Sequence, residues 1–109
     1  MPGKEAYDFF MATTADAPNW RNQITTESLE KTREFDASYM IHWLSPAALL
    51  VIPAEKDYLL PFPAVKEAFE KAKEPKSMLS LPVNHFEIYS DPWMSKAASA
   101  AIEWFKKYL

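Results

Sequence analysis

Glycine is almost absent from the sequence, which has a single one, Gly3, among 109 residues. Average usage of about 7% would give roughly eight glycines in a chain of this length. Phosphate-binding loops, dinucleotide-binding fingerprints and the G-x-S-x-G turn that presents a nucleophilic serine each need several glycines at fixed spacing. These 109 residues therefore exclude all three kinds of site.

Cysteine is absent, which excludes a disulfide framework, a thiolate nucleophile and a cysteine-ligated zinc site. Twelve Lys and Arg against 15 Asp and Glu give a net charge of −3, which argues against a nucleic-acid-binding surface. No apolar run approaches the roughly 18 residues of a membrane span, and residues 1–10, MPGKEAYDFF, lack the apolar core of a signal peptide. We expect a cytoplasmic protein that needs neither a membrane, nor nucleic acid, nor a cofactor.

Aromatic residues are abundant, with four Trp, five Tyr and seven Phe, and hydrophobic residues make up 49% of the chain. This composition is globular, and the length predicts one small domain covering residues 1–109. Aromatic side chains need a core or an interface. We expect most of them in the core, in particular Phe9, Phe10, Trp20, Trp43, Trp93 and Trp104.

Residues 1–46 predict a helical, cap-like segment. Apolar residues at helical spacing predict a helix over residues 4–14, and Pro18 and Asn19 indicate that residues 15–24 form a loop. A second helix is predicted over residues 26–35, with Glu27 in its first turn. Residues 36–46 form a short apolar connector with about one helical turn, stopped before Pro46.

Residues 47–109 are more regular and predict the order strand, helix, strand, helix. The apolar runs 47–54 and 78–83 are typical of strands covered on both faces. Residues 63–73 predict a helix whose apolar face is formed by Val65, Ala68, Phe69 and Ala72. A last helix follows Asp91 as N-cap and Pro92 at its first position, with an apolar stripe of Ala97, Ala98, Ala101, Ile102 and Phe105. The fold class is therefore α/β, with two parallel strands joined by a right-handed crossover.

Residues 48–89 resemble the C-terminal part of α/β-hydrolases. In that family an E-x-D-x-x-x-P motif after a late strand carries the triad acid, and a G-H-F loop after the last strand carries the histidine. The present sequence has EKDYLLP at 55–61 and NHF at 84–86. Residues 19–46 are similar to the preceding segment in a fungal branch of dienelactone-hydrolase-like, X-Pro-peptidase-like and polyketide-transferase-like proteins. The resemblance covers nearly the whole chain but only about the last third of a family member.

The resemblance implies a partial α/β-hydrolase fold in which Asp57 is the triad acid and His85 the base. It also implies a substrate-binding role for Trp20 and Tyr39, because the corresponding region lines or caps the pocket in the family. Glu55 is a weaker candidate for the acid.

The sequence departs from the family pattern at two glycine positions. Pro53 and Ala54 replace the glycine before E-x-D, and Pro53 removes a backbone donor at the end of a strand. Asn84 replaces the glycine before the histidine, where asparagine tolerates a left-handed backbone.

The nucleophile is the larger departure, because none of the serines lies on an elbow: Ser28, Ser38, Ser45, Ser77, Ser80, Ser90, Ser95 and Ser99. The family's oxyanion-hole residues are missing with it. Each candidate also has a plain structural interpretation: Asp57 suits a turn, His85 can be a loop residue without a role, and His42 beside Trp43 is a structural histidine. No ligand spacing supports a metal site formed by His42, His85 and Asp57.

Three functions remain open. The acid and histidine can complete a triad whose serine belongs to another polypeptide, for the hydrolysis or transfer of an ester or a polyketide-like acyl group. The Asp–His pair can instead serve a small proton-transfer enzyme, an isomerase, dehydratase or cyclase. The chain can also be a non-enzymatic dimeric binding protein. Two parallel strands do not make a stable sheet, so we expect a homodimer or docking to the protein that carries the serine.

Overall fold

The computed structural model describes residues 3–109, which divide into two compact units with a boundary after Asp36. The chain mixes helices with a two-stranded parallel sheet, as expected for the α/β class. The boundary lies ten residues before the one expected between the cap-like segment and the β-α-β-α unit. Each unit is described by itself below.

Residues 3–36 contain two short helices that match the predicted ones to within one residue at each end. Helix α1 (Lys4–Thr13) follows Gly3, whose φ of 107° only glycine adopts readily, and a 3₁₀ turn, η1 (Thr14–Asp16), continues it. Helix α2 (Thr26–Glu34) is capped by Thr25, whose hydroxyl accepts the backbone N–H of Ser28 at 3.1 Å. Every residue of α2 is exposed, which agrees with its thin apolar face.

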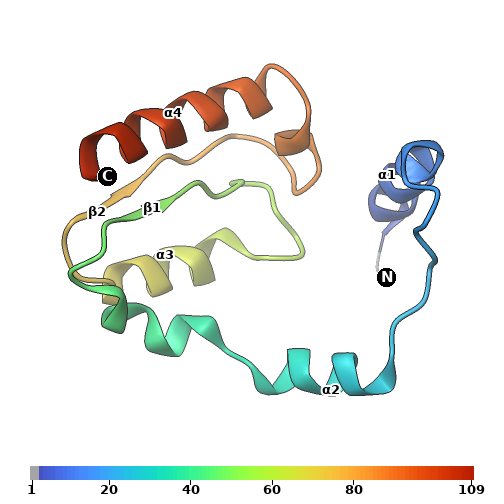
Figure 1. The fold of residues 1–109 in the computed structure, drawn as a ribbon, viewed down its shortest axis with the longest axis horizontal. Helices are drawn as coiled ribbons and strands as arrows, with labels where there is room; N and C mark the ends of the chain where they lie inside the picture. Colours follow the sequence, from blue (N-terminus) through green and yellow to red (C-terminus); the bar gives the residue numbers. More distant parts are fainter. Residues whose placement is uncertain (1–2) are drawn as a thin grey trace. The chain divides into compact units, whose positions relative to one another are not determined.

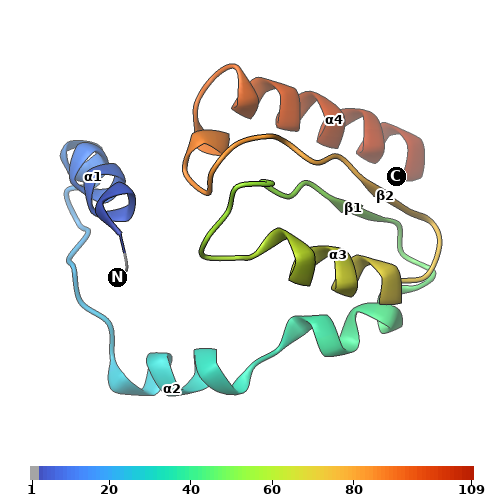
Figure 2. The same cartoon turned by 180° about the vertical axis from the view of Figure 1, so that it is seen from behind.

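Residues 37–109 contain the sheet. Strands β1 (Leu49–Val51) and β2 (Lys76–Met78) are parallel and lie side by side, with Leu49 opposite Lys76 (Figures 1 and 2). After a gap the pairing resumes at one isolated bridge between Ala54 and Leu81. The predicted strands at 47–54 and 78–83 are therefore wrong in extent, and β2 begins two residues earlier than expected.

Pro53 explains the gap. The backbone N–H groups of Leu79 and Leu81 donate to the carbonyls of Val51 and Pro53 at 3.0 and 2.9 Å, and Glu55 N–H donates to the Leu81 carbonyl at 2.8 Å. In this alternation the residue at position 53 should donate to the carbonyl of Leu79. Proline has no N–H to give, so the ladder loses one bond there and regular strand geometry ends.

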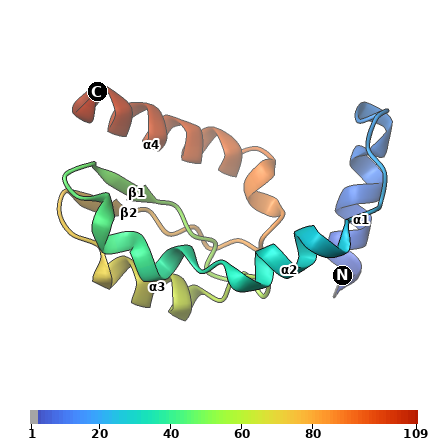
Figure 3. The same ribbon diagram turned by 60° about the horizontal axis from the view of Figure 1, so that its bottom comes forward.

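Helices cover the sheet on opposite sides (Figure 3). On one side lies α3 (Phe62–Lys71), which contacts η2 (Ala37–Leu44), an eight-residue 3₁₀ helix where about one helical turn was expected. The predicted apolar face of α3 is confirmed, because Val65, Ala68 and Phe69 are half-buried and Ala72 is buried. On the other side lies α4 (Trp93–Tyr108).

The predicted buried stripe of α4 is partly wrong. Ala97 and Trp93 pack against the core, whereas Ala98, Ile102 and Phe105 are exposed, the last two by 51% and 57%. The apolar residues of α4 spread over a wider part of its circumference than the sheet can cover, so only half of them are packed. Pro92 rather than Asp91 occupies the N-cap, although the Asp91 carboxylate still accepts the backbone N–H of Ser95 at 3.1 Å.

The core of this unit is small. Ala54, Leu81 and Val83 are buried, with half-buried neighbours from the strands, η3 (Glu87–Tyr89) and α4, namely Ile52, Leu79, Ile88, Trp93 and Ala97. The expectation that the aromatics fill a core is wrong for Trp43, which is 66% exposed. Phe9, Phe10, Trp20, Trp93 and Trp104 are half-buried. Over residues 3–109 no helix has both the length and the apolar character to cross a bilayer.

Candidate catalytic dyad

The turn after β1 fixes the carboxylate of Asp57. Its Oδ1 atom accepts the backbone N–H groups of Leu59 and Leu60 at 2.8 and 2.9 Å. Aspartate favours such turns because its short side chain bonds to the backbone two or three residues ahead. Oδ1 is thereby occupied, and Oδ2 is left for another partner.

The loop after the second strand is fixed by a reciprocal cap around His85. The Asn84 Oδ1 atom accepts the backbone N–H groups of Phe86 and Glu87 at 3.0 and 2.9 Å, and a Glu87 carboxylate oxygen accepts the Asn84 N–H at 2.7 Å. This is the arrangement of a capping box. The left-handed backbone that asparagine tolerates is not used at Asn84, because among residues 3–109 no non-glycine residue has a positive φ. The asparagine holds the turn through its side chain.

Two backbone hydrogen bonds join the turn that carries Asp57 (the acid turn) to the loop that carries His85 (the histidine loop). Glu55 N–H donates to the Leu81 carbonyl at 2.8 Å, and Lys56 N–H donates to the Val83 carbonyl at 3.0 Å. Because the strands are parallel, their carboxyl ends lie at the same edge of the sheet. Both loops therefore leave the sheet side by side.

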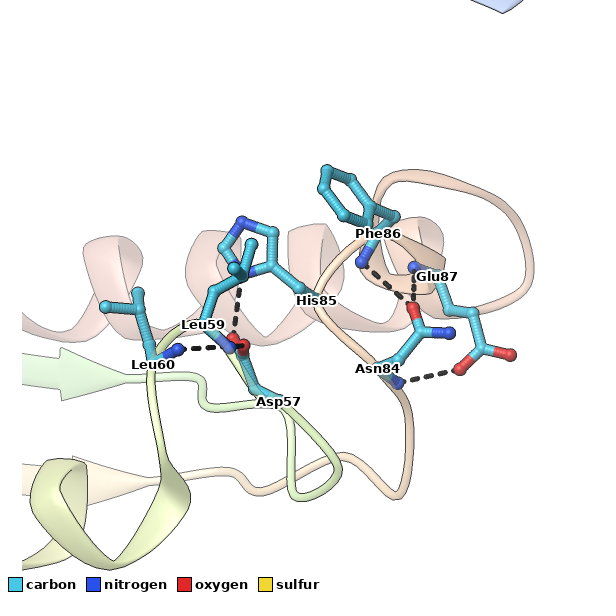
Figure 4. A network of polar contacts seen from close by, with 7 residues as sticks. All are labelled: Asp57, Leu59, Leu60, Asn84, His85, Phe86 and Glu87. Carbon is cyan, nitrogen blue, oxygen red and sulfur yellow. Dashed lines mark hydrogen bonds and ion pairs between the residues drawn. The ribbon is translucent and has the colours of Figure 1, made fainter. Parts of the chain in front are cut away.

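The side chains of Asp57 and His85 meet between these loops, as the resemblance implied. The His85 Nδ1 and Asp57 Oδ2 atoms are 2.8 Å apart (Figure 4). The Asp57 side chain is only 7% exposed, whereas that of His85 is 24% exposed. An ionised carboxylate only accepts hydrogen bonds, so Nδ1 carries a proton, and in the neutral imidazole Nε2 then has the lone pair. In Figure 4 the second ring nitrogen points away from Asp57. This is the orientation that a general base requires.

Asp57 stays ionised at neutral pH. Burial by itself raises the pKa of its carboxyl group, but hydrogen bonds from Leu60, His85 and Leu59 outweigh burial and hold the pKa below its ordinary value. The carboxylate can therefore fix the histidine tautomer and stabilise the imidazolium that forms when Nε2 takes a proton.

A cavity of about 270 Å³ opens beside the dyad. Its lining comes from β1 and the residues after it, the acid turn, α3 and the histidine loop, namely Val51, Ile52, Pro53, Ala54, Asp57, Leu60, Val65, His85, Ile88 and Tyr89. No serine or threonine lies in this lining.

The other predicted residues have partners or surroundings of their own. Glu55 accepts a hydrogen bond from the Ser80 hydroxyl at 2.6 Å, so Asp57 is the acid that meets His85. Trp20 belongs to the first unit, where its ring stacks on that of Phe10 with centroids 6.0 Å apart. Tyr39 is 76% exposed in η2 and does not line the cavity. The substrate-binding role of Trp20 and Tyr39 stays a prediction.

His42 lies edge-on to Trp43, with ring centroids 5.3 Å apart, which agrees with its structural interpretation. No group of three or more His, Cys, Asp or Glu residues within 3–109 is arranged to hold a metal ion.

Sequence reasoning missed Glu87 and the cavity residues Leu60, Val65 and Tyr89. The spacing of Asn84 and Glu87, three apart, is a capping-box signal that the sequence carries. The cavity has no such signal, because its lining depends on how α3 and the histidine loop pack on the sheet. The helical pattern predicts Val65 only as part of the apolar face of α3.

No family model matches the chain, and no curated protein matches it either. The resemblance to α/β-hydrolases therefore rests on the residues quoted for it, with Asp57 and His85 foremost.

Proposed function

We propose that the chain is related to the C-terminal portion of α/β-hydrolases, with the fungal branch named above as its source, and that His85 is a general base in acyl hydrolysis or transfer. The observation that carries this proposal is the hydrogen bond from His85 to an ionised Asp57, whose side chain is only 7% exposed, in the lining of a cavity. The hydroxyl nucleophile is supplied from outside residues 3–109, by another polypeptide or by a second substrate.

The chemistry assigns one task to each member of the pair. His85 Nε2 takes the hydroxyl proton while the hydroxyl oxygen attacks the carbonyl carbon of an ester or thioester. As the tetrahedral intermediate collapses, the same proton passes to the leaving group, and the bond between the carbonyl carbon and the leaving atom breaks. Asp57 holds the imidazole in the required tautomer and stabilises the transient imidazolium.

A small hydroxyl compound can stand in for the missing serine. We expect the full chain to accelerate acetylation of N-acetylserinamide by 4-nitrophenyl acetate, and His85→Ala to lower that acceleration at least tenfold, because general-base catalysis contributes about 10²–10⁴-fold when the groups are well positioned. The rate of serinamide ester formation is the measurement. A reduced rate in deuterium oxide is expected, since a proton moves in the rate-limiting step.

His42→Ala is the matched control, because it removes the other histidine and leaves the dyad intact. Equal rates for the two variants would contradict a general-base role for His85 and would favour the non-enzymatic binding protein. Labelling of a serine in this chain by a fluorophosphonate probe would contradict an external nucleophile.

The lack of a serine or threonine in the cavity lining also favours a second candidate. The Asp57–His85 pair can remove a proton from carbon in an isomerisation, dehydration or cyclisation, which needs no nucleophile. His85-dependent exchange of α-protons of a ketone into deuterium oxide, without serinamide acylation, would identify this chemistry.

For the assembly we propose a homodimer that pairs two copies of β1. The N–H and C=O groups of Leu50 and Ile52 point away from β2, because the ladder uses the alternate residues. Residues 47–54, AALLVIPA, have no charge to discourage pairing of this edge. The outer edge of β2 is protected, since the Glu74 carboxylate accepts the Lys76 N–H at 2.9 Å.

Light scattering tests this assembly. We expect a mass of about twice 12.6 kDa, and a monomer for Leu50→Pro, which removes an outward N–H but no ladder bond. Ile102→Lys, on the exposed face of α4, should stay dimeric, with unchanged circular dichroism for both variants. A monomeric wild-type chain, or dissociation by Ile102→Lys alone, would contradict pairing through β1. A complex with a serine-bearing protein in place of the dimer would mean that the β1 edge binds that protein and not a second copy of this chain.

A further inference from the structure

The longest stretch of the sequence without Asp, Glu, Lys or Arg is residues 37–54, which form η2 and β1. Charged residues make up 25% of the chain, and such residues belong mostly on the surface. The surface of η2 is nevertheless apolar, with 38–76% exposure at Tyr39, Met40, Trp43 and Leu44. A cluster of exposed apolar side chains marks an interaction site, and we call this one the η2 patch.

The other end of β1 is also followed by exposed apolar side chains. Tyr58 and Leu60 in the acid turn are 45% and 60% exposed. Leu60 also belongs to the cavity lining, together with residues 51–54 at the end of the strand. β1 therefore has apolar surface at both ends, with the η2 patch before it and the acid turn after it.

The free edge of β1 favours one register for a second copy. Residues two apart in a strand point their backbone groups the same way, so Ala48 joins Leu50 and Ile52 at this edge. Antiparallel pairing centred on Leu50 uses all three residues of each copy. Sliding the copies by two residues would instead recruit Pro46, which has no N–H, or Ala54, whose carbonyl already accepts a hydrogen bond in the acid turn. The register centred on Leu50 is therefore the favoured one.

This pairing brings the start of each β1 beside the end of the other. Ala54 lies opposite the partner's Pro46, just after the end of the partner's η2. A two-fold axis perpendicular to the sheet keeps the α3 side of both copies on one face, and η2 is on that side because it contacts α3. The cavity reaches the same side, since Val65 of α3 lines it. The partner's η2 patch therefore meets the cavity end of β1.

The area of these surfaces suits a stable dimer. Aromatic side chains bury about 150–250 Å² each, so Tyr39, Trp43 and Tyr58 at their present exposure offer about 400 Å² per copy. A specific interface buries about 800 Å² per partner, and the paired β1 strands and the aliphatic residues at both ends of β1 supply the rest. An aromatic surface poor in charge is also typical of the core of an interface.

We propose that dimerisation completes the cavity, with the partner's Trp43 forming the wall that the half-open cavity of a single copy lacks. Side chains three residues apart lie on one face of a 3₁₀ helix, so Met40 and Trp43 share an exposed face of η2, and Trp43 is the one nearer to β1. Each dyad thereby gains a substrate-binding residue from the other copy. The inference rests on the proposed dimer and on the proposed role of His85.

Cysteine cross-linking tests this placement without any activity. The chain has no cysteine, so Ser45→Cys and Leu60→Cys each carry a single thiol, and a link between positions 45 and 60 joins two copies. Ser45→Cys is a small change that leaves Trp43 in place. We expect a short bismaleimide to link an equal mixture of the two variants, with the joined peptides identified by mass spectrometry.

Ile102→Cys in place of Leu60→Cys is the matched control, because Ile102 is a similarly exposed apolar residue on α4, across the sheet from η2. It should give at least about tenfold less linked product, since an isologous interface joins fixed pairs of positions. Equal yields, or no link between positions 45 and 60 in a sample that is dimeric by light scattering, would overturn the inference and leave the dimer standing. A monomeric chain would overturn both.

Mixed dimers test whether Trp43 serves the other copy. Trp43→Ala is expected to raise the KM for 4-nitrophenyl acetate in the serinamide assay at least about tenfold with little change in kcat, because a pocket wall binds substrate and transition state alike. At low ester concentration an equal mixture with His85→Ala should exceed either variant and reach about a quarter of the wild-type rate, since half of the dimers are mixed and each of these has one intact site. The mixtures are compared at concentrations at which light scattering shows dimers.

An equal mixture of His85→Ala and Asp57→Asn is the control, and it should regain nothing because both residues belong to the same copy's dyad. A first mixture about half as active as Trp43→Ala alone would mean that Trp43 serves its own copy, which would overturn the inference. If His85→Ala does not change the serinamide rate but positions 45 and 60 are linked, the general-base role is wrong and the placement of the partner's Trp43 stands.

Discussion

Replacing Asp57 by alanine is expected to lower the free energy of unfolding of residues 37–109 by about 3 kcal/mol and to abolish the activity at His85. The change leaves the N–H groups of Leu59 and Leu60 and the Nδ1–H group of His85 without their acceptor. Hydrogen bonds to a charged group are worth about 1.5–3 kcal/mol each and are not additive. Denaturant unfolding measures the first effect, and the serinamide assay measures the second.

The same carboxylate should give the protein an acid-sensitive stability. The pKa of Asp57 is lower in the folded protein than its ordinary value of 3.8. Its contribution is therefore fully present above that value and is lost as the pH falls through the depressed folded pKa. We expect the wild-type unfolding free energy to fall below about pH 4, and the Asp57→Asn variant to lose less over the same window, because it has no carboxylate to protonate.

Glu67→Gln is the control for this pH dependence. The hydrogen bond and charge of Lys71 also lower the pKa of Glu67, but both side chains are largely exposed. Exposed ion pairs contribute little to stability, so this variant should keep the wild-type acid response. An Asp57→Asn variant whose stability falls as steeply as that of the wild type would show that other groups dominate the acid response.

Leu81→Ala should be the most damaging change in the core, with a loss of about 3 kcal/mol or more. Leu81 is 0% exposed, and its backbone pairs with both Pro53 and Glu55 at the bridge that resumes the sheet. Truncating a buried leucine typically costs about 2–5 kcal/mol, a large part of the stability of a small domain. The midpoint of urea unfolding measures the loss.

Ile102→Ala and Val83→Ala are the comparison variants that show whether the loss of stability follows burial. Ile102 is 51% exposed, so its truncation should cost little, whereas Val83 is 2% exposed and should give an intermediate loss if Leu81→Ala does not fold. A cost at Ile102 as large as that at Leu81 would mean that the exposed face of α4 is covered in solution.

The sequence carried enough information to place the acid and the histidine, because both follow apolar runs and match a known motif order. It also carried the apolar face of α3, since one face of that helix is apolar and the rest is charged. For α4 the apolar arc is wider than the surface it meets, and no pattern in the helix itself tells which half packs. Packing on the sheet decided that Trp93 and Ala97, not Ile102, face the core.

The strand limits could not be predicted from apolar runs alone. Residues 47–54 are apolar throughout, yet regular pairing stops at Val51 because Pro53 cannot donate to the ladder. At Asn84 the residue type suggested a left-handed turn, but its side chain competes for the same backbone groups and provides a cap instead.

Asp57 and His85 are 28 residues apart in the chain and belong to one strand–helix–strand crossover. Closing that single crossover brings acid and histidine together, and loop-closure entropy rises only slowly with loop length. The dyad therefore assembles in the same folding step as the sheet, and no distant segment has to arrive later to complete it. The geometry of the dyad depends on segments that are close in the sequence. The dyad therefore forms or is lost together with the hydrogen bond between Lys56 N–H and the Val83 carbonyl.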